Sequence, residues 1–315
     1  RGEAQKKNSS LETSESPTGD MTYSKEYYGP TPLRVGIEKS RNLMTVRLAQ
    51  AIGMDKVSET AERFGIVKNM PPQLAMALGS ADVRLIDMVA AYGALVNGGK
   101  KVEPTLIDRI QDRNGKTVFR HDDRTCPECD VKYWDNQPVP ILPDNRVQLT
   151  TPTSAYQIVT MLEGVVQRGT GRRIAELGKP LGGKTGTTND SRDTWFVGFS
   201  PDLAVGVYVG FDTPKPLGRR ETGSSVAAPI FKSFMEDALK NQPAVPFRVP
   251  PGLQLVRVDS RTGKPARSGS RGVILEAFLP GTVPAGDGRI LDGSQGASQR
   301  GTGASTPTSK LRGLY

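Results

Sequence analysis

The chain has 315 residues, of which 36% are hydrophobic, and this length and composition suffice for one or two packed domains. Lysine and arginine number 42 against 33 aspartate and glutamate residues, so the net charge is +9, which fits a solvated basic surface or an anionic partner. The absence of an 18-residue apolar run excludes a membrane-spanning helix from these residues. The absence of a helix-turn-helix, a zinc finger or an aromatic-studded basic strand argues against nucleic acid as a partner.

The first hundred residues read as a polar segment followed by helices. Residues 1–22 are polar and are predicted to be a disordered linker. Apolar residues recur at helical spacing over residues 33–52, which predicts one long helix. Asp55 is the expected N-cap of a second helix, whose apolar stripe spans residues 57–64. A third, buried helix is expected over residues 82–96.

The middle of the chain contains a predicted hairpin, an excursion and a helix. Residues 105–119 are expected to form a hairpin with Asn114-Gly115 as a two-residue turn. Residues 120–148 are charged and contain proline, so we expect them to form a surface excursion. A Thr-Pro pair predicts the capped start of a helix over residues 151–169.

The second half favours a sheet. Two strand-like segments, residues 194–199 and 203–211, are joined by so short a turn that they must be antiparallel. A closing helix is expected over residues 227–239. Helices, then strands, then a helix favour an α+β fold in which helices pack on an antiparallel sheet. A small β appendage over residues 252–284 and a disordered tail over residues 285–315 complete the prediction.

The excursion contains a Cys-x-x-Cys at Cys126 and Cys129, which leaves three interpretations open. A zinc site would need two further ligands, and His121 is the only histidine. A thioredoxin-like motif would need a flanking strand and helix, and Pro127 argues against them. A local disulfide, or a pair of free thiols, is favoured for an oxidising compartment. No metal or cofactor is expected.

Residues 181–188 read Leu-Gly-Gly-Lys-Thr-Gly-Thr-Thr, the most informative stretch of the chain. Glycine permits a ligand to approach the backbone closely, while Lys184 and the hydroxyls supply a cation and hydrogen-bond donors. Such a segment suits an anionic ligand. Residues 178–185 also match a phosphate-loop pattern, but polar residues precede it and turn formers come after it, which argues against a nucleotide site.

A different set of motifs agrees better with the rest of the chain. Lys184-Thr185-Gly186 and the distant Ser40-Arg41-Asn42 are two marks of serine acyltransferases of the penicillin-interacting class. Further matching runs lie at residues 28–34, 37–42, 45–50, 77–80, 98–99 with Pro104, 193–199 and 276–282. Together these runs resemble the transpeptidase domain of class A penicillin-binding proteins over most of residues 27–284.

The resemblance implies a fold and a reaction. The expected fold is an incomplete penicillin-binding transpeptidase or serine β-lactamase fold over residues 23–245. In it an antiparallel sheet lies between two helical layers, and the Lys-Thr-Gly segment lies on the edge strand that lines the cleft. The implied reaction is that of a D,D-transpeptidase or carboxypeptidase, which transfers the acyl group of a peptidoglycan stem peptide ending in D-Ala-D-Ala.

The resemblance also implies roles for individual residues. Ser40 would relay a proton to the leaving amine, Asn42 would bind the substrate amide and steady the catalytic lysine, and Lys184 would place positive charge near the substrate carboxylate. The substrate-binding residues would be Thr185, Gly186, Thr187 and Thr188. Among these, Thr185 and Thr187 would hydrogen-bond the carboxylate, and the N–H of Thr187 would form half of an oxyanion hole.

One departure from the family concerns the nucleophile. No serine in this sequence is followed by lysine three positions later, and the only hydroxyl with that spacing is Thr22 before Lys25. In the family the Ser-x-x-Lys segment lies well before the Ser-x-Asn segment. We therefore expect a C-terminal fragment whose nucleophile precedes Arg1. The alternative is a catalytically inactive, peptidoglycan-binding or scaffold protein, and a β-lactamase is disfavoured because its hydrolytic carboxylate has no recognisable motif here.

The same resemblance implies the partners and the location. Peptidoglycan stem peptides and lipid II-derived glycan are the expected substrates, and β-lactams are expected to acylate the intact parent. The family carries an N-terminal membrane anchor and a glycosyltransferase domain, which we expect before Arg1. The expected location is therefore the periplasmic face of the bacterial inner membrane, with no transmembrane segment in these residues.

Overall fold

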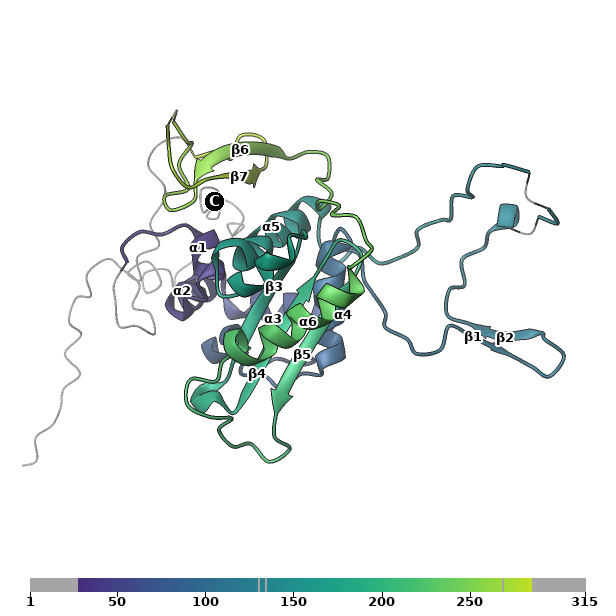
Figure 1. The fold of residues 1–315 in the computed structure, drawn as a ribbon, viewed down its shortest axis with the longest axis horizontal. Coiled ribbons are helices and arrows are strands. Elements are labelled where there is room, and N and C mark those ends of the chain that lie inside the picture. The colour runs from purple at the N-terminus through teal and green to yellow at the C-terminus, as the bar shows by residue number, and fades with distance from the viewer. Residues whose placement is uncertain (1–27, 130, 134, 268, 285–315) are drawn as a thin grey trace, which may run out of the picture.

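The computed structural model describes residues 28–284 except residues 130, 134 and 268 (Figure 1). Its α-helices are α1 (Leu33–Glu38), α2 (Asn42–Ile52), α3 (Met54–Arg63), α4 (Leu85–Val96), α5 (Pro152–Arg168) and α6 (Ala228–Ala238). Its strands are β1 (Arg109–Gln111), β2 (Thr117–Arg120), β3 (Gly182–Thr187), β4 (Asp193–Phe199), β5 (Ala204–Gly210), β6 (Gln254–Asp259) and β7 (Val273–Phe278). The linker expected over residues 1–22 and the tail expected over residues 285–315 lie outside the described residues.

Five shorter helical segments connect these elements. They are the 3-10 segments η1 (Leu74–Leu78), η2 (Pro127–Cys129), η3 (Arg172–Leu177) and η4 (Asn189–Ser191), and the π-helical η5 (Gly223–Ala227). The last of these leads directly into α6. Thr222 closes a capping box with Ser225 at its start, which gives the unpaired N–H groups of this helix a partner.

The central sheet has the order β3-β4-β5 and is antiparallel throughout, as the short connection predicts. The turn between β4 and β5 is closed by the N–H of Ser200, which donates to the carbonyl of Leu203 at 2.8 Å. Within the described residues β3 is an edge strand. The expected edge position of Lys184-Thr185-Gly186 is therefore confirmed.

Helices cover both faces of this sheet, which confirms the α+β architecture (Figure 1). Phe196 of β4 is fully buried and packs on Phe231 of α6, with ring centroids 4.7 Å apart. Phe199, three residues later, points to the opposite face and packs near Tyr92 of α4 and Val159 of α5. The two-residue period of a strand explains why neighbouring aromatic residues of β4 supply two separate cores.

Helix α5 begins and ends where the sequence predicts. The Thr151 side chain accepts a hydrogen bond from the N–H of Ser154 at 3.2 Å, and Pro152 occupies the first turn. The helix stops before Gly169. About half of the residues of α5 are buried, and its Val159 and Leu162 pack against Phe199 of the sheet.

The prediction of a single helix over residues 33–52 is wrong, because a turn at residues 39–41 separates two helices, α1 and α2. Ser40 adopts a left-handed conformation with φ of 53°. The N–H of Ser40 donates to Ile37 and the N–H of Arg41 donates to Gly36, the hydrogen-bond pattern of a Schellman motif. Glycine normally marks this position at the end of a helix. Serine occupies it here, so neither residue type nor hydrophobic spacing indicated that the helix ends.

Two helix starts also differ from the prediction. Asp55 is not an N-cap, because α3 starts at Met54 after Gly53 and Asp55 lies in the first turn. An acidic residue is favourable there through the helix dipole instead. The third helix begins at Leu85 rather than at residue 82.

The hairpin β1–β2 exists, but its turn is longer than predicted. Ile110 pairs with Phe119, and a bulge precedes the pair of Gln111 with Thr117. The Asp112 carboxylate accepts hydrogen bonds from the N–H groups of two residues of the turn, which makes the loop wider than a two-residue turn. Gly115, with φ of 80°, closes it.

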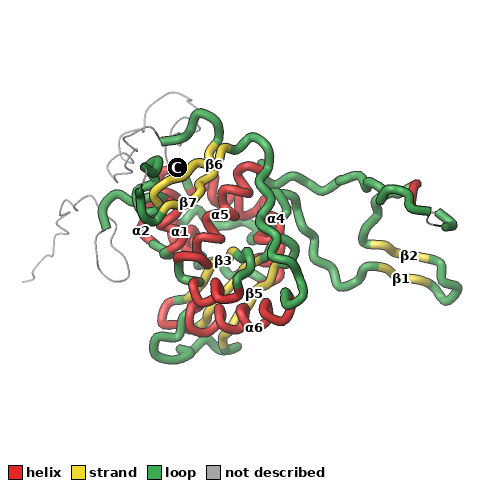
Figure 2. The backbone as a smooth tube through the Cα atoms, turned by 45° about the horizontal axis from the view of Figure 1, so that its top comes forward, coloured by secondary structure: helices red, strands yellow, loops and turns green. Residues whose placement is uncertain are grey.

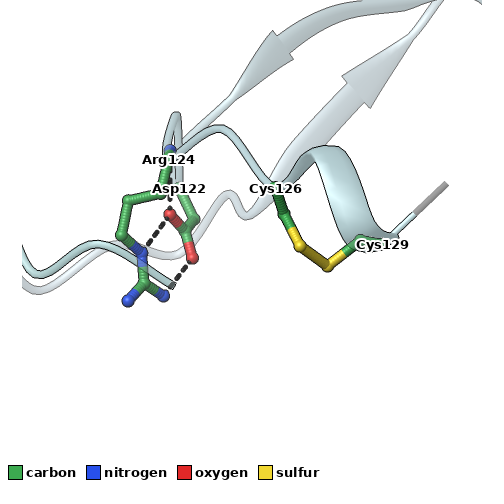
Figure 3. The surroundings of a disulfide bond; sticks show 4 residues. All are labelled: Asp122, Arg124, Cys126 and Cys129. Carbon is green, nitrogen blue, oxygen red and sulfur yellow. Dashed lines mark hydrogen bonds and ion pairs between the residues drawn. A yellow bond between two sulfur atoms is a disulfide. The ribbon is translucent and has the colours of Figure 1, made fainter. Parts of the chain in front are cut away.

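The hairpin belongs to a long excursion that projects away from the helices and sheet (Figures 1 and 2). Cys126 and Cys129 form a disulfide within it, beside the ion pair of Asp122 and Arg124 (Figure 3). The structure thus selects the disulfide among the interpretations of the Cys-x-x-Cys. The residues that the structure describes contain no cluster of three or more His, Cys, Asp or Glu side chains that could hold a metal ion.

Strands β6 and β7 form a second antiparallel hairpin inside the predicted appendage. It lies beside α1 and α5 (Figure 1), and the Gln157 side chain of α5 donates to the carbonyl of Ala277 at 2.9 Å. The domain limits at residues 23, 245, 252 and 284 remain predictions. No helix of the described ranges is long and apolar enough to cross a membrane.

The cores on the two faces of the sheet should dominate the free energy of unfolding. Replacing Phe196 with alanine should lower the free energy of unfolding by about 3–5 kcal/mol, because it empties a fully buried site. Urea unfolding followed by circular dichroism measures this. Phe119→Ala is the matched control: its ring lies on the projecting hairpin and is 45% exposed, so the expected change is within about 0.5 kcal/mol. Equal effects of the two changes would contradict the assignment of the core.

Candidate active site

The edge strand β3 comes very close to its neighbours because its first two residues are glycines. A Cβ on Gly182 would lie 2.8 Å from the ring of Phe199, and one on Gly183 would lie 2.7 Å from the ring of Phe196. Both glycines are buried. Their role in this structure is therefore to admit aromatic rings from β4, which differs from the expected role of exposing backbone to a ligand.

The two distant motifs meet in space. The ammonium Nζ of Lys184, on β3, lies 2.7 Å from Oγ of Ser40 and donates a hydrogen bond to it. It also donates to the carbonyl of Thr185 at 2.9 Å. The two side chains are 144 residues apart in sequence, so they meet only because α1 and β3 both pack against α5.

Ser40 holds this position with a strained backbone. A left-handed conformation costs a residue other than glycine about 1–3 kcal/mol and is concentrated at functional sites. The bend exposes Ser40 and points its hydroxyl at Lys184. Asn42 is the first residue of α2 and is exposed. In the described part of the chain, Lys184 bonds to Ser40 and Thr185 and not to Asn42.

Burial lowers the pKa of Lys184 to about 8, because desolvation disfavours the ammonium form. At neutral pH the side chain is still mainly protonated, which agrees with its donation of both hydrogen bonds. A small rise in pH would remove that charge. The site therefore offers an ammonium that is close to its titration point and in contact with a hydroxyl.

The threonines of the strand are tied to elements that the motifs did not indicate. The hydroxyl of Thr185 shares a hydrogen bond with that of Thr170 at 2.8 Å, and the carbonyl of Thr170 accepts one from Ser224. The hydroxyl of Thr187 accepts from the N–H of Gly223 at 2.9 Å. Sequence reasoning missed Thr170, Gly223 and Ser224. In the sequence, Gly169-Thr170-Gly171 reads only as the end of a helix.

The remaining threonine, Thr188, serves a local turn. Its hydroxyl accepts from the N–H of Asp193 at 2.9 Å, and Asp193 in turn accepts from the indole of Trp195. The phosphate-loop alternative is excluded by this part of the structure. Residues 182–187 form a sheet strand, and the chain then enters a short 3-10 turn that leads into β4 instead of a helix N-terminus.

Comparison with known proteins agrees with this geometry. Residues 2–236 match the family described as the penicillin binding protein transpeptidase domain. The chain therefore belongs to this family, as its motifs predict.

Its relatives within the family are penicillin-binding proteins 1A. The protein of that name from Rickettsia bellii is 48% identical over 258 residues, which cover 81% of this chain and 32% of the relative. The one from Pseudomonas aeruginosa is 35% identical over 299 residues, which cover 85% of this chain and 36% of the relative. The chain thus spans about a third of the length of these relatives.

Solved structures support the same fold. The crystal structure of penicillin-binding protein 1A from Haemophilus influenzae superposes with a TM-score of 0.69 at 31% identity, covering 84% of this chain and 42% of that one. The PonA1 protein from Mycobacterium tuberculosis, in complex with penicillin V, has a TM-score of 0.57 at 24% identity and covers 73% and 62% of the two chains. The second likeness supports the fold alone.

The low pKa of Lys184 makes a prediction about stability. Between pH 8 and pH 10.5 the unfolded chain keeps the Lys184 proton that the folded chain has lost, so folding becomes relatively more favourable as pH rises. The free energy of unfolding of the wild type should therefore increase over this range relative to Lys184→Met. Urea titrations of both proteins at pH 7, 8, 9 and 10 measure the difference. A difference that is constant with pH would contradict a lowered pKa.

Proposed function

We propose that this chain forms the cleft-lining part of a serine-type peptidoglycan D,D-transpeptidase. The observation that carries the proposal is the contact of Lys184 with Ser40, made by the two motifs of the family across 144 residues. The family match over residues 2–236 supports the reaction class. Carboxypeptidase activity would be the same acyl-enzyme chemistry with water as the acceptor.

The reaction proceeds by acyl transfer. A serine hydroxyl attacks the carbonyl of the penultimate D-Ala of a stem peptide, and terminal D-Ala leaves with a proton. An amine of a neighbouring stem then attacks the ester and gives up a proton to the serine oxygen, which forms the cross-link and restores the hydroxyl. Each of the two steps breaks one acyl bond, forms another and transfers one proton, so the reaction balances without a cofactor.

Residues of this chain have roles around that serine. Lys184 attracts the terminal carboxylate of the stem peptide and, with Ser40, forms a pair through which a proton can pass to the leaving D-Ala amine. The hydroxyls of Thr185 and Thr187 bind the same carboxylate, and the N–H of Thr187 stabilises the oxyanion. Asn42 binds the amide of the substrate backbone. Gly186 on the same strand and Thr188, in the turn that follows it, complete the substrate-binding segment.

The nucleophile itself lies in another part of the gene product in this proposal, because the sequence contains no Ser-x-x-Lys. The same product would carry a membrane anchor and a glycosyltransferase domain, which would place the cleft at the periplasmic face of the inner membrane. Its partners would be stem peptides and lipid II-derived glycan. Penicillin V is bound by the structurally similar PonA1, and β-lactams would acylate the product proposed here.

The test uses the intact product of the gene that encodes this sequence. Incubation with a fluorescent penicillin should give a covalent band, and peptide mapping should place the label on a serine followed by lysine three positions later. Lys184→Ala should slow labelling by about 100-fold or more, because the carboxylate of the penicillin loses the cation proposed to attract it and Ser40 loses its proton-transfer partner. Ser40→Ala should slow it by a smaller factor.

The matched control is Lys232→Ala, which removes a lysine of α6 whose ion-pair partner is Glu176 of η3 and which has no assigned role in the site. Its labelling rate should equal that of the wild type. A folded wild-type product that takes no label would favour the inactive, peptidoglycan-binding alternative. Labelling that is unaffected by Lys184→Ala would refute the roles assigned here.

A further inference from the structure

The turn that carries Ser40 directly follows a very short helix, α1. α1 has six residues and no side-chain cap at its start, and a helix of this length has little stability of its own. Three of its six residues are nevertheless buried, and two of those are the charged residues Arg34 and Glu38. Contacts with other elements must therefore set the place of α1.

Arg34 holds the first turn of α1. Its guanidinium makes two parallel hydrogen bonds to the carboxylate of Glu276 on β7. It also donates to the carbonyl and the hydroxyl of Thr160 on α5, at 2.7 and 2.9 Å. Bidentate arginine–carboxylate pairs fix orientation as well as distance, so the start of α1 is fastened to both the appendage and α5.

Glu38 holds the last turn. Its side chain is 4% exposed and lies 2.6 Å from the guanidinium of Arg168, at the end of α5. The notch that receives it is made by glycines. A Cβ on Gly164 would lie 2.0 Å from Oε1 of Glu38, and a Cβ on Gly169 would lie 2.2 Å from its carbonyl oxygen.

The backbone at the same place is tied to the strand site. The carbonyl of Glu38 accepts from the N–H of Thr170 at 3.1 Å, and Thr170 shares the hydroxyl hydrogen bond with Thr185 on β3. Lys39 donates to the carbonyl of Arg168 at 2.6 Å. The two residues that precede Ser40 are thus anchored to the end of α5, beside β3.

We propose that Glu38 is a positioning residue, which holds the turn of Ser40 so that its hydroxyl meets the ammonium of Lys184. The catalytic consequence of this positioning rests on the proposed function. Glu38 touches neither Ser40 nor Lys184 through its side chain. It acts by fixing the end of α1 in the glycine notch of α5, two residues before the strained bend at Ser40.

The charges of the network make Glu38→Gln an informative variant. Glutamine keeps the size that fills the notch and removes the charge. Arg34, whose guanidinium lies 3.6 Å from the Glu38 carboxylate, keeps Glu276 as its partner. The side chain of Arg168 is 30% exposed and can turn to water. No buried charge is left unpaired, so the fold should survive while the hold on the turn is weakened.

The test measures labelling and the Lys184 titration together. In Glu38→Gln we expect the second-order rate of acylation by fluorescent penicillin to fall about tenfold, which is about 1.4 kcal/mol of activation free energy. NMR titration of lysine side chains, with Lys184 assigned through Lys184→Arg, should show its pKa moving up from about 8, because a displaced Ser40 turn admits water. A purely structural role would lower the melting temperature without moving this pKa.

Gly164→Ala is the second variant, because it fills the notch and displaces the carboxylate without changing any charge. It should reproduce both effects, and it decides the question if Glu38→Gln does not fold. Glu59→Gln, which removes the carboxylate of an exposed pair with Lys56 on α3, is the matched control and should change neither readout.

The result that overturns the proposal is an unchanged acylation rate and an unchanged Lys184 titration in the folded variants. This outcome is distinct from failure of the proposed function. If the wild-type gene product takes no label, the transpeptidase proposal fails. The titration in Glu38→Gln and Gly164→Ala still decides whether Glu38 positions Ser40 against Lys184.

Discussion

The close packing of β3 against the aromatic residues of β4 is the constraint on which the site depends. Gly182 and Gly183 leave space for the rings of Phe199 and Phe196, which point to opposite faces of the sheet. The start of β3, just before Lys184, therefore packs closely against aromatic rings of both cores. A Cβ at either glycine would overlap an aromatic ring, so the strand or the ring would have to shift next to the residue that carries the ammonium.

The site combines a desolvated cation with a strained hydroxyl. Burial weakens the hold of Lys184 on its proton, and the left-handed bend presents Ser40 to it. Each feature is unfavourable for folding when taken alone. Their combination puts a hydroxyl in hydrogen-bond contact with an ammonium whose pKa lies close to neutral, which is the geometry that the proposed proton relay to the leaving amine uses.

Some structural elements could be predicted from the sequence and others could not. The antiparallel pair of strands and the capped start of α5 follow from local patterns, since turn length and Thr-Pro capping act within a few residues. The edge position of Lys184 was expected from the family resemblance and not from any local pattern. The helix break at Ser40 did not follow, because a serine occupies a position that glycine normally marks. The hairpin turn was longer than predicted, because Asp112 accepts backbone N–H groups across it.

The sequence by itself determined the family, the motif residues and the alternation of helices and strands, because these depend on residue identity and on short-range spacing. Only the tertiary structure decided that Lys184 meets Ser40, that Thr170 lies beside Thr185, and that Arg34 is clamped by Glu276. The last of these pairs spans 242 residues. Contacts at such separation arise from the packing of α1 and α5 against the sheet and the appendage, and no local pattern encodes them.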